Sequence, residues 1–328
     1  MSRFIGTIYM ESDDKTLTLS NNNLVVKEAD ISLPLKDISA LVIRGRTTLS
    51  SEILMACINC GVTITFLDGY GNYRNTIHPD IKGNVITRYK QIVKSSDIEK
   101  RKVIALSIYK GKITNQLNTI KKFIYNHGST LNTDKAIIMI SNEKDVNNSI
   151  DHQAILGKEG LCAKYYFNCF PDMILNDEFE FNGRQYHPCI DEVNALLSYG
   201  YGLLRHDLEK YIQMSGLDPY VAFLHSERTG RMSLALDLME EFRPWIIDRM
   251  VLDIINRHQV TKTQFTINNE KEIYCGGEIR KILINLYEKK KASKINGQTV
   301  NDIIKHQVMH FARVIRDEDA EYKSFIYR

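Results

Sequence analysis

Residues 216–244 read GLDPYVAFLHSERTGRMSLALDLMEEFRP, and this stretch is the most informative part of the chain. His225 ends an apolar run, and Asp237 and Glu240 follow inside a segment dominated by Leu, Ala, Met and Phe. Burying carboxylates among aliphatic side chains is unfavourable unless a cation or hydrogen bonds compensate the charge. A histidine followed by two acids one helical turn apart therefore suggests a divalent metal site.

The acid pair falls in a segment predicted to be helical over residues 233–257. Ser233 is a suitable N-cap, which puts Asp237 early in the helix, where the positive end of the dipole favours an anion. Asp237 and Glu240 lie on one helix face and can aim two carboxylates at one ion. Two alternatives compete with this interpretation: Asp237 only compensates the dipole, and Glu240 forms a salt bridge with Arg243.

Glu159 is a third notable acid, within a helix predicted over residues 151–169. Its position on that helix faces the buried side, so an ionised carboxylate there needs a partner. Lys158 and Lys164 are close in sequence, but helical geometry projects both away from this face. A functional role is favoured over a local ion pair. Its neighbours three and four residues away are Ile155, Leu156, Cys162 and Ala163.

Glu159, His225 and Glu240, together with water oxygens, would suit Mg²⁺ or Mn²⁺, and the imidazole shifts the choice somewhat toward Mn²⁺. A lone histidine after an apolar run is more often a hydrogen-bonded core residue, and that alternative stays open.

Competing motifs are weak. Cys57 and Cys60 have C-x-x-C spacing without a second pair, which favours core packing over zinc. The sequence contains no Walker A motif, so a nucleotide-driven enzyme is not expected.

Residues 1–80 are predicted to form a β-rich unit, because short apolar and β-branched runs alternate there with turn residues. A helix is predicted from Ser50 or Ser51 to Cys60, and a hairpin turn at 68–71. The predicted strands cover 5–9, 16–19, 24–26, 31–35, 40–43 and 62–67.

From about residue 88 the pattern becomes that of amphipathic helices, which predicts an α+β protein with a linker over 81–90 and a larger helical catalytic domain over 91–328. Residues 126–149 are polar and are predicted to include a loop, and residues 171–190 are predicted to be irregular. Gly200 and Gly202 would let another helix pack closely. The further predicted helices cover 192–214, 233–257 with a break or kink at Pro244, 277–290 and 299–316.

Composition is that of a globular protein with two domains: 328 residues, 43% hydrophobic and 25% charged. The N-terminus lacks a signal-peptide pattern, and no stretch approaches the roughly 20 apolar residues of a membrane helix. The six cysteines form no small-domain disulfide framework. We therefore expect a cytoplasmic protein without membrane contacts.

Basic residues are concentrated in two segments, although the net charge is only +3. Residues 88–122 carry ten Lys or Arg against two acids, and residues 280–294 carry six against one. Such segments can neutralise DNA phosphates, with affinity falling steeply as salt rises. Each segment alone is as easily explained by a solvated helix face. Together with a candidate metal site, the two favour nucleic acid as a partner.

With these residues in view, the sequence closely resembles the CRISPR-associated integrase/endonuclease family, the universal metal-dependent DNases of the adaptation (spacer acquisition) complex. The resemblance covers nearly the whole chain, and its last block is highly specific. The blocks that carry it are 41–43, 62–68, 158–160 with Ala163 and Tyr166, 194–201, and 216–219 through 242–244.

The resemblance implies that Glu159, His225 and Glu240 are metal ligands and that Asp237 is the adjacent catalytic acid. The family often has Asp where this chain has Glu240, a longer arm that keeps an oxygen ligand. It also implies an N-terminal β-sandwich, an all-helical C-terminal domain, a homodimer and a small ferredoxin-like CRISPR adaptation protein as partner.

The activity that the resemblance implies is integration of double-stranded DNA. The 3′-OH of a captured fragment attacks a phosphodiester at the CRISPR repeat boundary, and a bound cation would activate the hydroxyl. His225 could instead transfer a proton. Arg243 is placed to hold a phosphate unless it pairs with Glu240. The basic segments would hold DNA backbone without reading sequence, with phosphate contacts expected at Arg88, Lys289 and Lys290 as well as Arg243.

Two other functions compete with integration. The first is a DNA-binding scaffold whose acids only stabilise helices, and the second is a stand-alone repair nuclease for branched DNA. Substitution of Glu159 by alanine separates the scaffold from the enzymes. Dependence on a partner and a repeat sequence separates the nuclease from the integrase.

Overall fold

The computed structural model describes residues 2–4, 6–11, 13–71, 73–77, 79, 85–144, 146, 150–186 and 188–327, with the side chains of 2–4 left out. The chain divides into two compact units, residues 1–83 and 84–328. The predicted strand residue Ile5 and residues 81–84 of the predicted linker lie outside the described residues.

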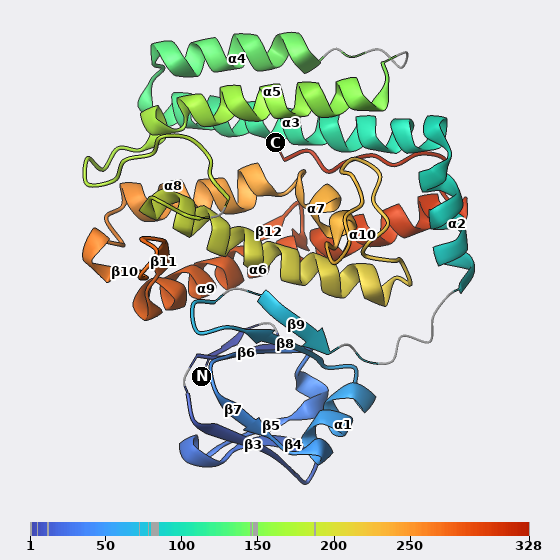
Figure 1. Cartoon of the computed structure of the whole chain (residues 1–328), viewed down its shortest axis with the longest axis vertical. Coiled ribbons are helices and arrows are strands. Elements are labelled where there is room, and N and C mark those ends of the chain that lie inside the picture. The colour runs from blue at the N-terminus through green and yellow to red at the C-terminus, as the bar shows by residue number, and fades with distance from the viewer. Residues whose placement is uncertain are drawn as a thin grey trace. The chain divides into compact units, whose positions relative to one another are not determined.

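The first unit consists of two β-sheets with one helix, α1 (Ser51–Asn59) (Figure 1). One sheet has the strand order β1-β2-β6-β8-β9, with β2, β6 and β8 parallel, and the other has the order β5-β4-β3-β7. The strands are β1 (Ser2–Phe4), β2 (Thr7–Met10), β3 (Lys15–Ser20), β4 (Asn23–Val26), β5 (Ile31–Pro34), β6 (Ala40–Arg44), β7 (Thr47–Leu49), β8 (Thr63–Leu67) and β9 (Tyr73–Ile77).

The two sheets share one hydrophobic core, which confirms the expected β-sandwich. Ile8 and Ile64 from one sheet and Leu17 from the other are fully buried in the same cluster. Alternation of side chains along a strand sends every second residue to this shared face. Cys57 also lies in the cluster, which confirms core packing for this cysteine, whereas Cys60 is exposed. Ser50 caps α1 by accepting a hydrogen bond from the backbone of Ile53 at 3.3 Å, as predicted.

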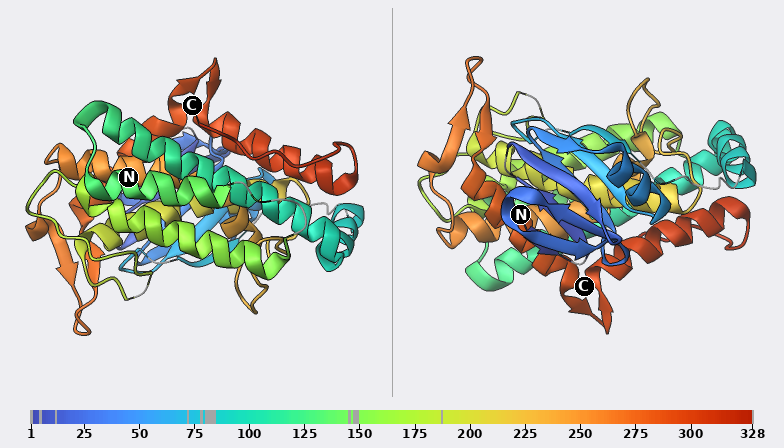
Figure 2. Two further views of the ribbon diagram at one scale, coloured as in Figure 1. Left: turned by 90° about the horizontal axis from the view of Figure 1, so that it is seen from above. Right: turned by 90° about the horizontal axis from the view of Figure 1, so that it is seen from below.

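The second unit is mostly helical, and two short hairpins modify the expected all-helical domain. Figure 2 shows α3, α4 and α5 lying side by side, and Figure 1 shows this layer covering α6 and α8. The helices are α2 (Val85–Ser96), α3 (Ile98–His127), α4 (Leu131–Lys144), α5 (His152–Cys169), α6 (Glu192–Met214), α7 (Ser233–Met239), α8 (Arg249–Asn256), α9 (Gly277–Ala292) and α10 (Val300–Arg316). The hairpins pair β10 (Phe265–Ile267) with β11 (Ile273–Cys275) and β12 (Lys294–Ile295) with β13 (Gln298–Thr299).

Two of the predicted connections contain helices in the structure. Residues 85–90 of the predicted linker form the first turns of α2. The segment 126–149 includes the predicted loop at 128–130, but it also contains α4, which was not predicted. The polarity of α4 was misleading because only a narrow stripe of it, including Ala136 and Ile140, is buried. None of the helices in the described part of the chain combines the length and apolar character that crossing a bilayer requires.

The predicted break near Pro244 is confirmed, and it takes the form of a wide turn. α7 ends at Met239, and Arg243–Asp248 form a π-helical turn, η4, with Pro244 at its start, where a missing N–H is tolerated.

A Cβ on Gly200 of α6 would lie 2.6 Å from the side chain of Ile247, which confirms close packing there. Gly202 has nothing within 4 Å of such a Cβ, so the same prediction was wrong for Gly202.

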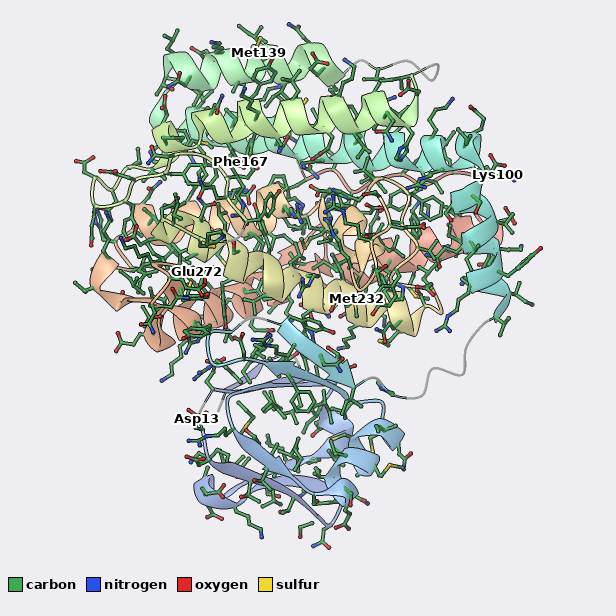
Figure 3. All side chains as sticks on the ribbon, in the orientation of Figure 1. Asp13, Lys100, Met139, Phe167, Met232 and Glu272 are labelled. Atoms are coloured by element: carbon green, nitrogen blue, oxygen red, sulfur yellow. The ribbon has the colours of Figure 1, made fainter. Side chains whose placement is uncertain are left out.

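The aromatic interior between the two helical layers fixes the position of α5. Phe167, labelled in Figure 3, points from α5 toward the layer of α6 and α8. Its ring centroid lies 5.7 Å from that of Phe170 and 6.0 Å from that of Phe181. These contacts hold α5 in a defined rotation about its axis, which directs Glu159 toward α3.

Residues 317–327 follow α10 and run along α3. Gly111 allows the close approach, because a Cβ there would lie 2.3 Å from Ser324 Cβ. Asn115 donates a hydrogen bond to Phe325 O at 2.8 Å and accepts one from Tyr327 N at 2.9 Å. This C-terminal segment also reaches Glu241, the residue that follows Glu240.

Candidate metal centre

A lysine ammonium joins the two outer acids predicted as metal ligands. Glu159 projects from α5, Glu240 follows α7, and Lys112 lies in the interior of α3. Lys112 Nζ contacts Glu159 Oε1 directly and lies 2.8 Å from Glu240 Oε2. The structure therefore brings Glu159 and Glu240 to one point, and the cation between them comes from a helix that the sequence analysis did not connect with the site.

The charges at this point are strongly interdependent. Burial alone would raise the pKa of Glu240, but Arg243, Lys112 and His225 outweigh burial and lower it to about 2. Burial alone would lower the pKa of Lys112, but Glu159 and Glu240 outweigh burial and hold it above its ordinary value. Glu240 is thus an anion at neutral pH and Lys112 is a cation.

His225 presents one ring nitrogen to the acid cluster and the other to Asp237. Its Nδ1 lies 2.7 Å from Asp237 Oδ1, and its Nε2 lies 3.9 Å from Glu240 Oε1. Burial opposes protonation of the imidazole, but Asp237, Glu240 and Glu159 outweigh it and raise the pKa of His225. His225 is hydrogen-bonded through Nδ1, as the alternative of a hydrogen-bonded core histidine predicts, but its Nε2 faces Glu240, so its proposed role as a ligand stays a prediction.

Asp237 has a different position from the one predicted. It does not share a target with Glu240, because its carboxylate accepts hydrogen bonds from the backbone N–H groups of Phe223, Leu224 and His225 at 2.7, 2.8 and 3.0 Å. The predicted N-cap at Ser233 was also wrong, since Met232 is the capping residue and makes no side-chain cap bond. Asp237 therefore orients His225 and holds the segment before it, and does not contact the point between the outer acids.

The segment that carries His225 has no regular secondary structure, yet its backbone is well satisfied by side chains from separate helices. Arg101 of α3 donates to Phe223 O and His225 O, both at 3.1 Å, and His152 of α5 lies 2.7 Å from Phe223 O. Asp237 binds the backbone N–H groups of this segment, and Arg101 and His152 bind its carbonyl oxygens. Together these contacts fix the path of residues 223–225. The imidazole is positioned by this framework and not by local propensity.

Replacing Asp237 with asparagine is expected to lower the free energy of unfolding by about 2–3 kcal/mol, because an amide cannot accept from three backbone N–H groups and the ring nitrogen together. Chemical denaturation would measure the loss. Asp253, exposed on α8, is the matched control: its change to asparagine should leave the unfolding midpoint close to wild type. Equal midpoints for both variants would contradict the bracing role of Asp237.

Arg243 forms the ion pair with Glu240 that was the alternative to its predicted phosphate contact, at 2.7 Å from Nη1 to Oε1. Its guanidinium also lies over the ring of Tyr201, 4.9 Å from the centroid. The Tyr201 hydroxyl donates to Asp248 at 2.6 Å, and Tyr166 donates to the same carboxyl at 3.0 Å. Burial raises the pKa of Asp248 to about 6, against the lowering effect of these hydrogen bonds. Arg243 is thus held against the acid cluster from two sides.

The donor set fits a hard divalent cation by its chemistry. The Lys112 ammonium lies as a stand-in cation between the carboxylates of Glu159 and Glu240, and His225 Nε2 lies 3.9 Å from the other oxygen of Glu240. In the present side-chain positions, however, no three His, Cys, Asp or Glu side chains of the described residues are gathered closely enough to hold an ion. The cation between Glu159 and Glu240 in this structure is the Lys112 ammonium.

The basic segments are less available to DNA than the sequence suggested. Lys90 and Lys94 pair with Asp317 at 2.9 and 2.6 Å, and Lys291 is buried between Asp207 and Glu288. The excess of basic over acidic residues in the two segments therefore overestimates the positive charge that is exposed to solvent.

The predicted phosphate contacts differ in their surroundings. Arg88 and Lys289 are exposed. Lys290 lies over the rings of Trp245 and Tyr327, at 5.2 and 5.5 Å from the centroids. Only Arg243, of the four predicted contacts, lies at the acid cluster.

Lys112 and Arg101 are two cations around this cluster that the sequence analysis missed as individuals, because both were counted only within a basic segment. A signal for Lys112 was available. It shares a helix face with Ile108, Tyr109 and Gln116, all buried, and a lysine at that position requires a partner just as Glu159 does.

Solved structures with the same fold include several with related descriptions. The Cas1 protein of Thermotoga maritima superposes with a TM-score of 0.82 at 19% identity, covering 98% of this chain and 100% of that one. A casposase bound to integration product gives 0.83 at 23% identity, covering 98% and 94%. A Cas6-RT-Cas1–Cas2 complex gives 0.81 at 20% identity, covering 98% of this chain and 36% of the longer one. These matches confirm the α+β architecture.

Sequence comparison identifies the family itself. A curated protein named CRISPR-associated endonuclease Cas1 1, from Chlorobaculum tepidum, is 30% identical over 343 residues and covers 100% of both chains. The family model of CRISPR associated protein Cas1 matches residues 8–289, which include Lys112, Glu159, His225 and Glu240. The chain that joins two carboxylates through one ammonium, with an imidazole beside the second of them, therefore belongs to the Cas1 family.

Proposed function

We propose that this chain is a divalent-metal-dependent DNA endonuclease and integrase of CRISPR adaptation, which joins the 3′-OH ends of captured DNA to the CRISPR repeat by transesterification. The observation that carries the proposal is that one ammonium joins Glu159 to Glu240, with His225 Nε2 3.9 Å from Glu240 Oε1, in a member of the Cas1 family. Curated relatives of this chain are named CRISPR-associated endonucleases.

The chain's own residues would divide the work of this reaction. Mg²⁺ or Mn²⁺, held by Glu159, His225 and Glu240, would supply Lewis-acid stabilisation and lower the pKa of the attacking hydroxyl. Asp237 holds the Nδ1 side of the imidazole, which turns Nε2 toward Glu240 as a ligating histidine requires. Arg243 lies beside Glu240, where its charge would help to hold the scissile phosphate.

Transesterification keeps the number of phosphodiester bonds constant, because one P–O bond breaks for each one that forms. The reaction therefore needs no nucleotide to drive it, in line with a sequence without a Walker A motif. The leaving 3′-oxygen of the repeat needs a proton, and His225 could supply one only when it is not bound to metal.

The proposed partners are double-stranded DNA, as captured fragments and as the CRISPR repeat, a small ferredoxin-like adaptation protein, and a second copy of this chain in a homodimer. Support for a partner protein comes from the similar fold within a Cas6-RT-Cas1–Cas2 complex. The proposed compartment is the cytoplasm. Arg88 and Lys289 are exposed and can contact DNA backbone.

The test is joining of a labelled branched DNA by the chain alone, in Mn²⁺ and in EDTA, for wild type, His225→Ala and Glu159→Ala. We expect joining in Mn²⁺ with wild type, and none in EDTA or with either variant. Joining that persists in EDTA, or in both variants, would rule out the metal assignment. Metal-dependent joining with no preference for a repeat sequence, even with the partner protein added, would favour a repair nuclease.

A further inference from the structure

Lys112 occupies an unusual position for a lysine. It lies in the middle of α3, its side chain is only 8% exposed, and its helix neighbours Tyr109, Ile113 and Gln116 are buried. Long basic side chains normally extend their charged end to water. Here the ammonium instead ends between Glu159 and Glu240, the two acids proposed to bind metal.

We propose that Lys112 is a resident counter-cation of the metal-free site, and that a divalent ion must displace its ammonium in order to bind Glu159 and Glu240. The inference rests on the proposed function, because it takes these carboxylates as metal ligands. It adds that the chain itself sets the strength of metal binding through an internal competitor.

The need for such a cation follows from the charges. Glu240 is 1% exposed, Glu159 is 14% exposed, and two anions at one poorly hydrated point repel each other. Arg243 pairs with Glu240, whereas Lys112 is the cation in contact with Glu159 and with both acids at once. Lys112 therefore stabilises the folded chain before metal binds.

The same contacts oppose the metal. Ammonium and divalent ion require the same carboxylate oxygens, and two cations so close together repel. With Lys112 between Glu159 and Glu240, the described His, Cys, Asp and Glu side chains form no metal-binding group of three. A flexible four-carbon stem lets the ammonium swing away without a change in α3.

The experiment measures Mn²⁺ affinity of the full chain without DNA, by electron paramagnetic resonance of free Mn²⁺. Lys112→Met, which keeps the length of the stem, and Lys112→Gln, which keeps a hydrogen-bond donor, are compared with wild type. We expect both variants to bind Mn²⁺ about tenfold more tightly, and to unfold at a lower temperature without metal. Added Mn²⁺ should raise their unfolding temperature more than that of wild type.

Lys158→Met is the matched control, because Lys158 is next to Glu159 in sequence but pairs with Glu143. It removes the same charge from α5 without opening the site, so its Mn²⁺ affinity should equal that of wild type. A Lys112 variant that folds only in Mn²⁺ would also support the proposal, since the metal would then replace the lost Lys112 ammonium.

Equal or weaker Mn²⁺ binding by both Lys112 variants would overturn the role of Lys112. Failure of the proposed function has a different signature: wild-type binding that is absent, or that His225→Ala leaves unchanged, would overturn the metal assignment itself. If Lys158→Met binds Mn²⁺ as tightly as the Lys112 variants do, the change in affinity follows from the loss of one positive charge anywhere nearby. That result would also overturn the proposal.

Discussion

Glu240→Gln is expected to lower metal-dependent DNA joining by on the order of 10³-fold while the chain stays folded. Glutamine keeps the volume of a side chain that is 1% exposed, and it keeps an oxygen for Arg243, 2.7 Å away. It removes the negative charge that a divalent ion requires. The loss should therefore lie in metal binding and in the chemical step, and less in stability.

Joining of branched DNA over a range of Mn²⁺ concentrations measures this effect. Glu143→Gln is the control, because Glu143 pairs with Lys158 outside the site, and joining should continue at the wild-type rate. Glu240→Asp keeps a carboxylate oxygen for the ion and should retain most activity. Full joining by Glu240→Gln would show that Glu240 serves only to neutralise Lys112 and Arg243.

Glu241→Ala is expected to lower the free energy of unfolding by about 3–5 kcal/mol, the range for removing one partner from a buried polar network. The Glu241 carboxyl accepts from the Tyr322 hydroxyl at 2.7 Å and from the Phe325 N–H. Alanine leaves both donors buried and unpaired. The C-terminal segment should then come away from α3 before the rest of the unit unfolds.

Urea denaturation measures the loss, and limited proteolysis near residue 322 reports release of the segment. Glu241→Gln keeps an acceptor oxygen and should lose much less stability than alanine. Glu321→Ala, at an exposed residue in the same segment, should behave as wild type. An unfolding midpoint for Glu241→Ala equal to that of Glu321→Ala would mean that the segment is not held by Glu241.

Much of the fold could be predicted because its elements carry strong local patterns. The strands of the first unit alternate, and α6 and α10 follow a helical period. α4 could not be recognised in this way, because its apolar residues do not follow one face: Leu131 and Ile138 are exposed, and Thr133, Ala136 and Ile140 are the buried ones. Contact with α3 and α5, which sequence pattern does not reveal, decides its structure.

The sequence pointed to Glu159 and Glu240 as candidate site residues, but it did not reveal the contacts of Asp237 and Lys112. Glu159 could be identified because its helix face is apolar, and Glu240 because it lies among aliphatic residues. The role of Asp237 depends on backbone donors in an irregular segment, which leave no periodic signal. The position of Lys112 depends on how α3 packs between α5 and the turn after α7, and only tertiary structure determines that.

The irregular segment before His225 has a practical consequence for protein engineering. Its path is determined by Gln91, Arg101 and His152 as well as Asp237, which come from α2, α3, α5 and α7. Residues 218–237 moved alone into another scaffold would keep only one of these four anchors. The smallest unit that can be transplanted with its histidine correctly aimed is the set of four helices, so redesign of this site should begin from the helices and leave the loop itself unchanged.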